Sequence, residues 1–263
     1  MTASPAFVSR GDGPPLVFLH GVGGNKETWA DQLDHFAARG WRAIAWDMPG
    51  YGDSAALAAM TWPALADALL ALVDRIGAER VTVVGHSMGG MVAQEFAASH
   101  AERLRALALS GTSAAFGGRD GKWQQEFVSA RLAPLDAGRT MADLAQGLVA
   151  AMVGPAPDPA GLAAAIGAMA RVPPATYRAA VQCLTTFDRK DNLARIAVPT
   201  LVLAAEHDRN APPAMMERMA ARIPGAVYRC LPGLGHLANL ERPADFNAAL
   251  DDFLTTLNGS RPR

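Results

Sequence analysis

A serine stands between two glycines in the segment VTVVGHSMGG, residues 81–90. The short apolar run Val81–Val84 predicts a buried strand, and the residues from Met88 onward predict a helix. Glycines two positions before and after Ser87 let the chain turn sharply there, which leaves the serine hydroxyl at the apex of the turn, above the end of the sheet. The amides that begin the helix favour negative charge at the same point. Ser87 is therefore predicted to act as a nucleophile.

A serine hydroxyl is a poor nucleophile until a base removes its proton, and the chain has six histidines. His236 lies in LPGLGHLANLERP, on a predicted loop that follows a late strand and precedes a helix. This loop should emerge at the same end of the sheet as Ser87, so His236 is the predicted base. The other five are expected in other settings: in a glycine turn (His20), pointing away from the serine (His86 and His207), or solvated on amphipathic helices (His35 and His100).

The base needs a carboxylate that fixes its tautomer and stabilises the imidazolium. Asp208, in LVLAAEHDRN, follows an apolar run that predicts a strand. The order Ser87, Asp208, His236 is the order expected when these three residue types act together on a parallel sheet. Glu206 is an alternative because it lies nearer the strand end. Asp47 also ends a predicted strand, but it precedes the serine and is expected to order its own turn.

Acyl transfer also needs donors for the oxyanion of the tetrahedral intermediate. The amide of Met88, directly after the nucleophile, is one predicted donor. The second should come from the loop after the first predicted core strand, where HGVGG occupies residues 20–24. Its glycines allow close backbone approach, and the amide of Val22 is the predicted second donor.

Short apolar runs with little charge alternate with helical patterns along most of the chain. This alternation predicts an α/β fold with a mostly parallel sheet flanked by helices. The predicted strands are Leu16–Leu19, Arg42–Trp46, Val81–Val84, Ala106–Leu109, Thr200–Ala204 and Val227–Leu231, and the clearest helices are Trp62–Ile76, Met91–Ser99, Ala214–Ile223 and Pro243–Leu257.

The alternation stops between residues 112 and 192, where only helical patterns and Gly/Pro breaks occur. The prediction is an α/β core formed by residues 1–111 and 193–263, with a helical cap at 112–192 over the carboxyl ends of the strands. The nearly uncharged stretch Leu144–Ala170 contains Gly154 and several prolines, so it is predicted to form two short helices and not a membrane span.

Composition argues against several classes of partner. The formal net charge is −1, so neither nucleic acid nor a membrane surface is an expected partner. Cys183 and Cys230 have no metal-ligand spacing, and both are predicted to be buried thiols in a reducing compartment. The N-terminal residues MTASPAFVSRGDG lack a basic segment followed by an apolar run. A cytoplasmic protein is predicted, and a homo-oligomer is left open.

Five segments, taken in order, resemble the α/β-hydrolase superfamily: HGVGG, DMPGYGDS, GHSMGG, AEHD and GLGHLANLERP. They span most of the chain, and the predicted insertion lies where that family carries its cap domain. Within the superfamily, the chain most resembles bacterial esterases and 3-oxoadipate enol-lactonases, in part through FDRKDNLARIAVPTLVLAAEHD.

The chain departs from the patterns of several members of this superfamily. Little sequence precedes the strand predicted at Leu16, so the first strand of the family sheet is expected to be short or absent. His86 and Leu237 stand where carbon–carbon hydrolases of this fold typically carry Asn and Trp. Ser87 excludes the Asp nucleophile of haloalkane dehalogenases and epoxide hydrolases. Val22 replaces the Trp that is usual in cofactor-free haloperoxidases.

These features predict a serine hydrolase that cleaves a small ester or (enol-)lactone through an acyl-enzyme, without metal or organic cofactor. Ser87 would attack the carbonyl, His236 would transfer the proton to the leaving alcohol, and Asp208 would orient His236. Two alternatives are left open: a hydrolase of carbon–carbon bonds in meta-cleavage products, and a receptor-like protein that binds a small molecule with little turnover.

Overall fold

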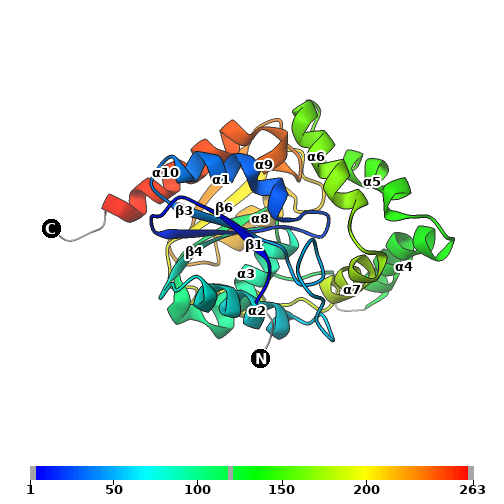
Figure 1. Ribbon diagram of the computed structural model, residues 1–263, viewed down its shortest axis with the longest axis horizontal. Helices are drawn as coiled ribbons and strands as arrows, with labels where there is room; N and C mark the ends of the chain where they lie inside the picture. The colour runs from blue at the N-terminus through cyan, green and yellow to red at the C-terminus, as the bar shows by residue number, and fades with distance from the viewer. Residues whose placement is uncertain (1–3, 118–120, 260–263) are drawn as a thin grey trace.

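The computed structural model describes residues 4–117 and 121–259, which contain a seven-stranded sheet (Figure 1). The strand order is β1-β3-β2-β4-β5-β6-β7, with β1 antiparallel to β3 and all other neighbouring strands parallel. The prediction of a mostly parallel α/β sheet is confirmed. The strands are β1 (Phe7–Arg10), β2 (Pro15–Leu19), β3 (Arg42–Trp46), β4 (Val81–His86), β5 (Leu104–Ser110), β6 (Thr200–Ala205) and β7 (Val227–Leu231).

Side chains that alternate along the strands pack against helices on both faces of the sheet. In β2, Leu16 and Phe18 belong to one buried cluster with α1 (Ala30–Ala37) and α10 (Pro243–Gly259). Val17 and Leu19 belong to the other cluster. That second cluster contains side chains of α2 (Trp62–Arg75), α3 (Met88–Ser99) and α8 (Pro213–Ala220). Burial on both faces explains why the central strands are apolar without alternation.

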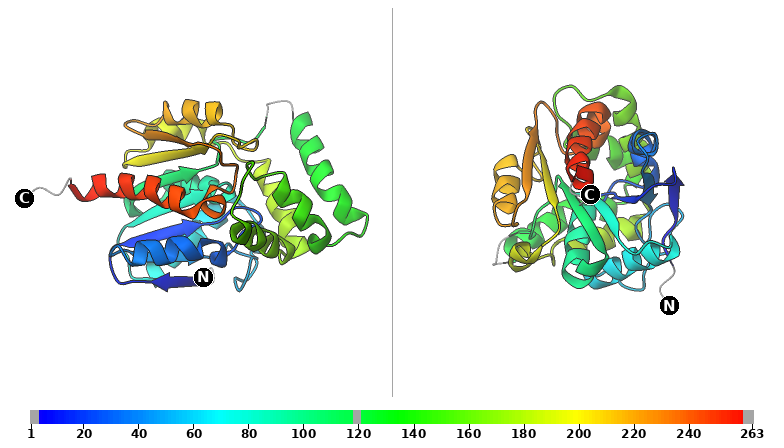
Figure 2. Two further views of the ribbon diagram at one scale, coloured as in Figure 1. Left: turned by 90° about the horizontal axis from the view of Figure 1, so that it is seen from above. Right: turned by 90° about the vertical axis from the view of Figure 1, so that its left-hand side faces the viewer.

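Four helices follow β5 and lie together beyond one end of the sheet (Figures 1 and 2). Between β5 and β6, the described residues form no sheet strand, only an isolated bridge between Ala115 and Asp188. The stretch Leu144–Ala170 is divided between the second and third of these helices. Within residues 4–117 and 121–259, no helix is long and apolar enough to cross a membrane. The four helices are α4 (Lys122–Asp136), α5 (Met141–Ala150), α6 (Pro159–Ala170) and α7 (Pro174–Leu184).

Shorter elements complete the chain. They are the 3₁₀ helices η1 (Lys26–Trp29), η2 (Ala101–Arg103) and η3 (Lys190–Arg195), and the one-turn helix α9 (Ala238–Glu241).

From the sequence, the first strand of the sheet is expected to be short or absent, and the last predicted strand is expected to be buried like the others. β1 is present, as a four-residue antiparallel edge strand. The run Val227–Leu231 does form a strand, but it is the opposite edge, and only its last residue is buried. The prediction that Cys230 is buried is therefore wrong, because its side chain lies on this exposed edge, whereas Cys183 in α7 is buried as expected.

Two histidines predicted to be solvated are largely covered. His35 lies on α1, and its Nε2 is 2.6 Å from an oxygen of Asp251. His100 follows α3, and its Nε2 is 3.3 Å from an oxygen of Asp67. Their side chains are only 22% and 18% exposed, since each is covered by a neighbouring helix that carries its carboxylate partner.

Candidate active site

Ser87 occupies a strained turn between β4 and α3. Its φ of 53° makes it the only residue other than glycine with positive φ in the described part of the chain, a conformation that costs on the order of 1–3 kcal/mol. A Cβ on Gly85 would lie 2.5 Å from the carbonyl oxygen of Gly89, and one on Gly89 would lie 2.2 Å from that of Leu19. Both glycines are therefore required by close backbone contact, as the sequence pattern predicted.

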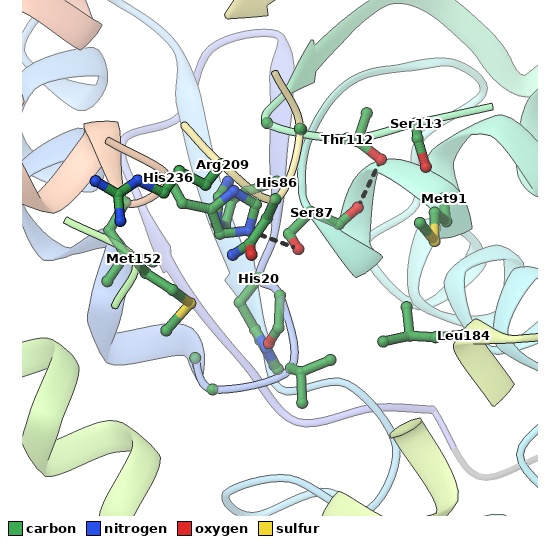
Figure 3. Close-up of a pocket in the computed structure, with 18 of the residues that line it drawn as sticks. His20, His86, Ser87, Met91, Thr112, Ser113, Met152, Leu184, Arg209 and His236 are labelled. Atoms are coloured by element: carbon green, nitrogen blue, oxygen red, sulfur yellow. Dashed lines mark hydrogen bonds between the residues drawn. The ribbon is translucent and has the colours of Figure 1, made fainter. Parts of the chain in front are cut away.

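Hydrogen bonds from β5 and the loop after it hold this turn in place. The Ser87 amide donates to the carbonyl of Ser110 (2.9 Å), and the hydroxyl of Thr112 donates to the carbonyl of Ser87 (2.8 Å). Figure 3 shows the second bond on the far side of the serine from His236. The strained backbone is thus fixed from a neighbouring strand.

The structure brings the three predicted catalytic side chains into one hydrogen-bonded chain. The Oγ of Ser87 is 3.0 Å from Nε2 of His236 (Figure 3), and Nδ1 of His236 is 2.7 Å from Oδ2 of Asp208. The residues come from the β4–α3, β6–α8 and β7–α9 connections, which meet at the carboxyl edge of the parallel strands. The side chains of His236 and Asp208 are 5% and 0% exposed.

Asp208 is placed to remain ionised. Burial by itself would raise its pKa, but His236 and the amides of Ala211 and Asn210 together lower the pKa below its ordinary value. The two amides donate to Oδ1 at 2.9 and 2.8 Å. An ionised carboxylate only accepts hydrogen bonds, so Nδ1 of the neutral His236 ring must carry the proton. This tautomer leaves Nε2 free to accept the proton of Ser87.

The two competing carboxylates lie elsewhere. Glu206 has a half-exposed side chain and accepts a hydrogen bond from the amide of Gly233 at 2.7 Å. Asp47 is fully buried and holds its own turn, through Nζ of Lys26 (2.5 Å) and the amide of Asp53 (3.0 Å). Of the three carboxylates considered from the sequence, only Asp208 bonds to His236.

The loop of residues 20–24 lies directly against the serine. A Cβ on Gly21 would be 2.9 Å from the Cβ of Ser87. The carbonyl of Gly21 accepts from Nδ1 of His20 at 2.7 Å and from the amide of Gly24 at 3.1 Å. The carbonyl of Gly21 and the amide of Val22 belong to one planar trans peptide and point in opposite directions. The two hydrogen bonds that hold the carbonyl therefore also fix the direction of the Val22 N–H.

His20 can hold this loop only while its ring is neutral. Its Nε2 accepts from the amide of Met48 at 2.9 Å, so Nδ1 carries the proton. Burial lowers the pKa of His20 to about 4, and the bond to Gly21 offsets only part of this effect. Within the described residues, no backbone or side-chain acceptor engages the amide of Val22 or Met88, so both remain available as donors.

His86 lies beside the triad, contrary to the expectation that it points away. Its ring centroid is 4.8 Å from that of His236, and it lines the same cavity. Burial lowers its pKa to about 3, and the nearby His236 lowers it further. The side chain points inward because β4 is a central strand that is buried on both faces.

A cavity of about 550 Å³ is lined by Ser87 and His236 and extends toward the four helices α4–α7. This volume suits a small ligand. Among the described residues, the lining side chains with a formal charge are Arg131 and Arg209, and most of the remaining lining is apolar. Apolar side chains from the insertion line much of this cavity, among them Phe127, Val149, Met152, Met169, Val181 and Leu184.

Within the described ranges, no group of three or more His, Cys, Asp or Glu residues could hold a metal ion.

One residue of the site that the sequence pattern did not single out is Glu241. It is a buried carboxylate that bonds to the amides on both sides of His236. A lone glutamate in LANLERP carries no local signal of this role, because the loop fold that turns the amides of Gly235 and Leu237 toward it, and its third partner Gly154, are not visible in that segment.

The doubly wound sheet, the strained serine turn and the hydrogen-bonded triad are the features of a nucleophile-elbow hydrolase. Residues 14–243 match the family model described as the alpha/beta hydrolase fold. The chain belongs to this family.

Individual relatives cover almost the whole chain. It is 30% identical over 261 residues to the protein named "Putative carbamate hydrolase RutD" of Caulobacter sp. (strain K31), covering 93% of this chain and 91% of the relative. Among solved structures, it is similar to a thermophilic esterase from Thermogutta terrifontis, with a TM-score of 0.86, 27% identity, and 96% and 93% of the two chains covered. It is also similar to the enol-lactonase from Burkholderia xenovorans LB400, with a TM-score of 0.81, 27% identity, and 95% and 96% covered.

Proposed function

We propose that this hydrolase cleaves a small carboxylic ester or (enol-)lactone through an acyl-enzyme on Ser87. The observation that carries the proposal is the continuous hydrogen-bonded chain from Asp208 through His236 to Ser87, which opens into a mostly apolar cavity. The similarity of this chain to an esterase and to an enol-lactonase supports this substrate class.

The reaction follows from the positions of the protons. Nε2 of His236 accepts the hydroxyl proton as Oγ of Ser87 bonds to the carbonyl carbon, and the resulting imidazolium is stabilised by the carboxylate of Asp208. The amides of Val22 and Met88 are the proposed donors to the oxyanion. His236 then protonates the leaving alkoxide as the carbon–oxygen bond breaks. Water, activated by the same base, releases the acid and regenerates the serine.

Oxyanion donors help only if they are directed before the reaction begins. The two hydrogen bonds to the carbonyl of Gly21 fix the peptide plane that carries the amide of Val22. Met88 begins α3, so its amide lies at the positive end of the helix dipole. Both proposed donors therefore belong to rigid backbone, which supports acyl chemistry over simple ligand binding.

The alternative of carbon–carbon bond cleavage uses the same triad, so the neighbouring side chains must discriminate. Leu237 lines the cavity next to His236 and offers neither a hydrogen bond nor an aromatic ring. The buried His86 ring is held neutral, with a pKa of about 3. The lack of a hydrogen-bonding or aromatic group at position 237, beside the reacting centre, disfavours the dienol intermediate of that reaction.

A substrate panel tests the proposal. We expect kcat/KM for a short aryl ester or an enol-lactone to exceed that for a meta-cleavage dienoate by at least about a hundredfold. A carbamate of the same alcohol should be included, and stopped-flow mixing with an activated ester should give a burst of one alcohol per active site. Equal rates for ester and dienoate would support the carbon–carbon alternative, and binding without a burst or turnover would support the receptor-like alternative.

A further inference from the structure

Glu241, the last residue of α9, is a buried carboxylate that the proposed reaction does not use. Only 1% of the residue is exposed. Its Oε1 accepts from the amide of Leu237 at 3.0 Å, and its Oε2 accepts from the amides of Gly235 at 2.9 Å and Gly154 at 2.7 Å. Burying a carboxylate is costly unless it is well hydrogen-bonded. These three amides therefore account for its position.

Two of the three donors flank His236 in the sequence. Residues 232–237 lie between β7 and α9 and belong to neither strand nor helix, so no regular hydrogen-bond ladder fixes the backbone that carries the imidazole. Glu241 holds the residue before and the residue after His236 with a single side chain. The ring must reach two partners at once, at 3.0 and 2.7 Å, and this requires a fixed backbone.

The third donor ties the same carboxylate to the helical insertion. Gly154 lies in the connection between α5 and α6, and the carbonyl of Met152 in that connection accepts from the amide of His236 at 2.7 Å. A Cβ on Gly235 would lie 2.4 Å from that carbonyl oxygen. The amide of Asp158 donates to the carbonyl of Glu241 at 2.9 Å. The two segments are therefore in direct backbone contact, joined through Glu241.

We propose that Glu241 is a positioning residue that fixes the imidazole of His236 between Ser87 and Asp208 by clamping the loop of residues 235–237 to the α5–α6 connection. The proposal rests on the triad chemistry proposed above. A displacement of about 1 Å in a reacting group can cost about a hundredfold in rate, so loosening this clamp should act on kcat and not on substrate affinity.

The decisive variant is Glu241→Gln, which keeps the shape but replaces one acceptor oxygen with an NH₂ group that faces at least one amide N–H. We expect kcat for an activated aryl ester to fall about 10- to 100-fold, with KM within about twofold of the wild-type value. Phosphonylation of Ser87 by a small organophosphonate should slow by the same factor. Glu241→Asp retains the charge on a shorter side chain and should show a smaller loss of kcat. It replaces Glu241→Gln in the test if the Gln variant does not fold.

Two controls separate positioning from general stability. Glu206→Gln removes a carboxylate that bonds to Gly233 of the same loop but is half-exposed. Leu250→Ala lowers the free energy of unfolding from a buried site on α10. Both variants should keep wild-type kcat where they are folded.

The proton on Nδ1 of His236 provides a readout that does not need turnover. Its hydrogen bond to Asp208 should give a strongly downfield proton resonance in the wild-type protein. We expect this resonance to shift or broaden in Glu241→Gln and to stay unchanged in both controls. A variant with lower stability but wild-type kcat and an unchanged resonance would reduce Glu241 to a structural role. If the wild-type protein hydrolysed no ester, the proposed function would fail, but the resonance would still test the clamp.

Discussion

The core and the helical insertion both line the cavity, but they are packed in different ways. Helix α3, which begins directly after the serine, buries ten of its twelve residues, and β4 buries all six. Helix α4 of the insertion buries two of its fifteen residues, although Trp123 and Phe127 on it line the same cavity. The predicted catalytic groups come from the tightly packed core, and much of the apolar lining of the cavity comes from the insertion, whose first helix is mostly exposed.

The same division appears in the placement of titratable groups. All six histidines of the chain lie in the α/β core formed by residues 1–111 and 193–263, and residues 112–192 contain none. The described residues of the insertion contribute mostly apolar side chains to the cavity, together with Arg131 and a few hydroxyl groups. The insertion reaches the predicted catalytic residues through hydrogen bonds, between Thr112 and the carbonyl of Ser87 and between residues 152–158 and the segment of residues 235–241. The core should therefore control rate, and the insertion should control selectivity.

The largest effect should come from removing the nucleophile. Ser87→Ala should lower kcat by about 10⁴- to 10⁶-fold, because the remaining groups cannot form the acyl-enzyme. The native fold should be retained, since the Ser87 hydroxyl bonds to His236 and the backbone of the turn is held by other groups. Steady-state hydrolysis and circular dichroism measure the two quantities. A variant with a tenth of wild-type activity would remove Ser87 from the proposed role.

The second largest effect should distinguish two carboxylates that lie two residues apart. Asp208→Asn should lower kcat by about 10⁴-fold, because an amide at this position favours the wrong tautomer of His236. Glu206→Gln should change kcat less than about twofold, because its carboxylate bonds to Gly233 and not to the triad. The measurement is kcat for one ester, compared between the wild type and the two variants. A severe defect in the Glu206 variant alone would contradict the assignment of the acid.

The hydrogen-bonded arrangement of Ser87, His236 and Asp208 could be predicted from sequence because each residue carries a local signal. The glycines around Ser87 have no alternative in the turn, since a Cβ on either would collide with backbone. Asp208 and His236 each follow a strand whose partner strands end at the same edge of the sheet. Order along the chain and strand ends together determine the triad, without knowledge of the packing.

Features that depend on neighbours from elsewhere in the chain could not be predicted. The run Val227–Leu231 has the composition of a buried strand, but composition does not reveal that it forms the edge of the sheet, where Cys230 is exposed. His86 lies beside His236 because two connections meet there. Glu241 also bonds to Gly154, on a segment far away in the sequence, and no local pattern announces that contact.

The third prediction concerns acid stability, which should be a property of the core. The native pKa values of His20 and His86 are about 4 and about 3, below the ordinary value of 6.5. The unfolded chain therefore binds more protons as the pH falls below 6.5, so the free energy of unfolding should decrease toward pH 4. Each such histidine contributes about a tenfold increase in the unfolding constant per pH unit.

Urea unfolding at several pH values between 7 and 4 measures this slope. In His20→Asn one proton fewer is bound on unfolding. The factor by which the unfolding constant rises per pH unit should therefore be about ten times smaller than in the wild type. Leu250→Ala serves as the control, since losing buried apolar volume should lower stability by a similar amount at every pH. Parallel curves for the wild type and His20→Asn would show that His20 is not held neutral in the native state.

The smallest effect should come from the insertion and should appear only in selectivity. Met169 of α6 lines the cavity and approaches the loop of residues 20–24 so closely that a Cβ on Gly23 would lie 2.2 Å from its Cε. Met169→Ala should open space beside the acyl group and shift the ratio of kcat/KM for long over short acyl esters by about tenfold. The rate at which a small phosphonate modifies Ser87 should stay within about twofold of wild type, because the reacting groups all belong to the core. Gln146→Ala, an exposed position on α5, is the matched control and should change neither quantity. If Met169→Ala slowed the phosphonate and the long ester by the same factor, the insertion would take part in the chemistry itself, and the division of roles between the two regions would be wrong.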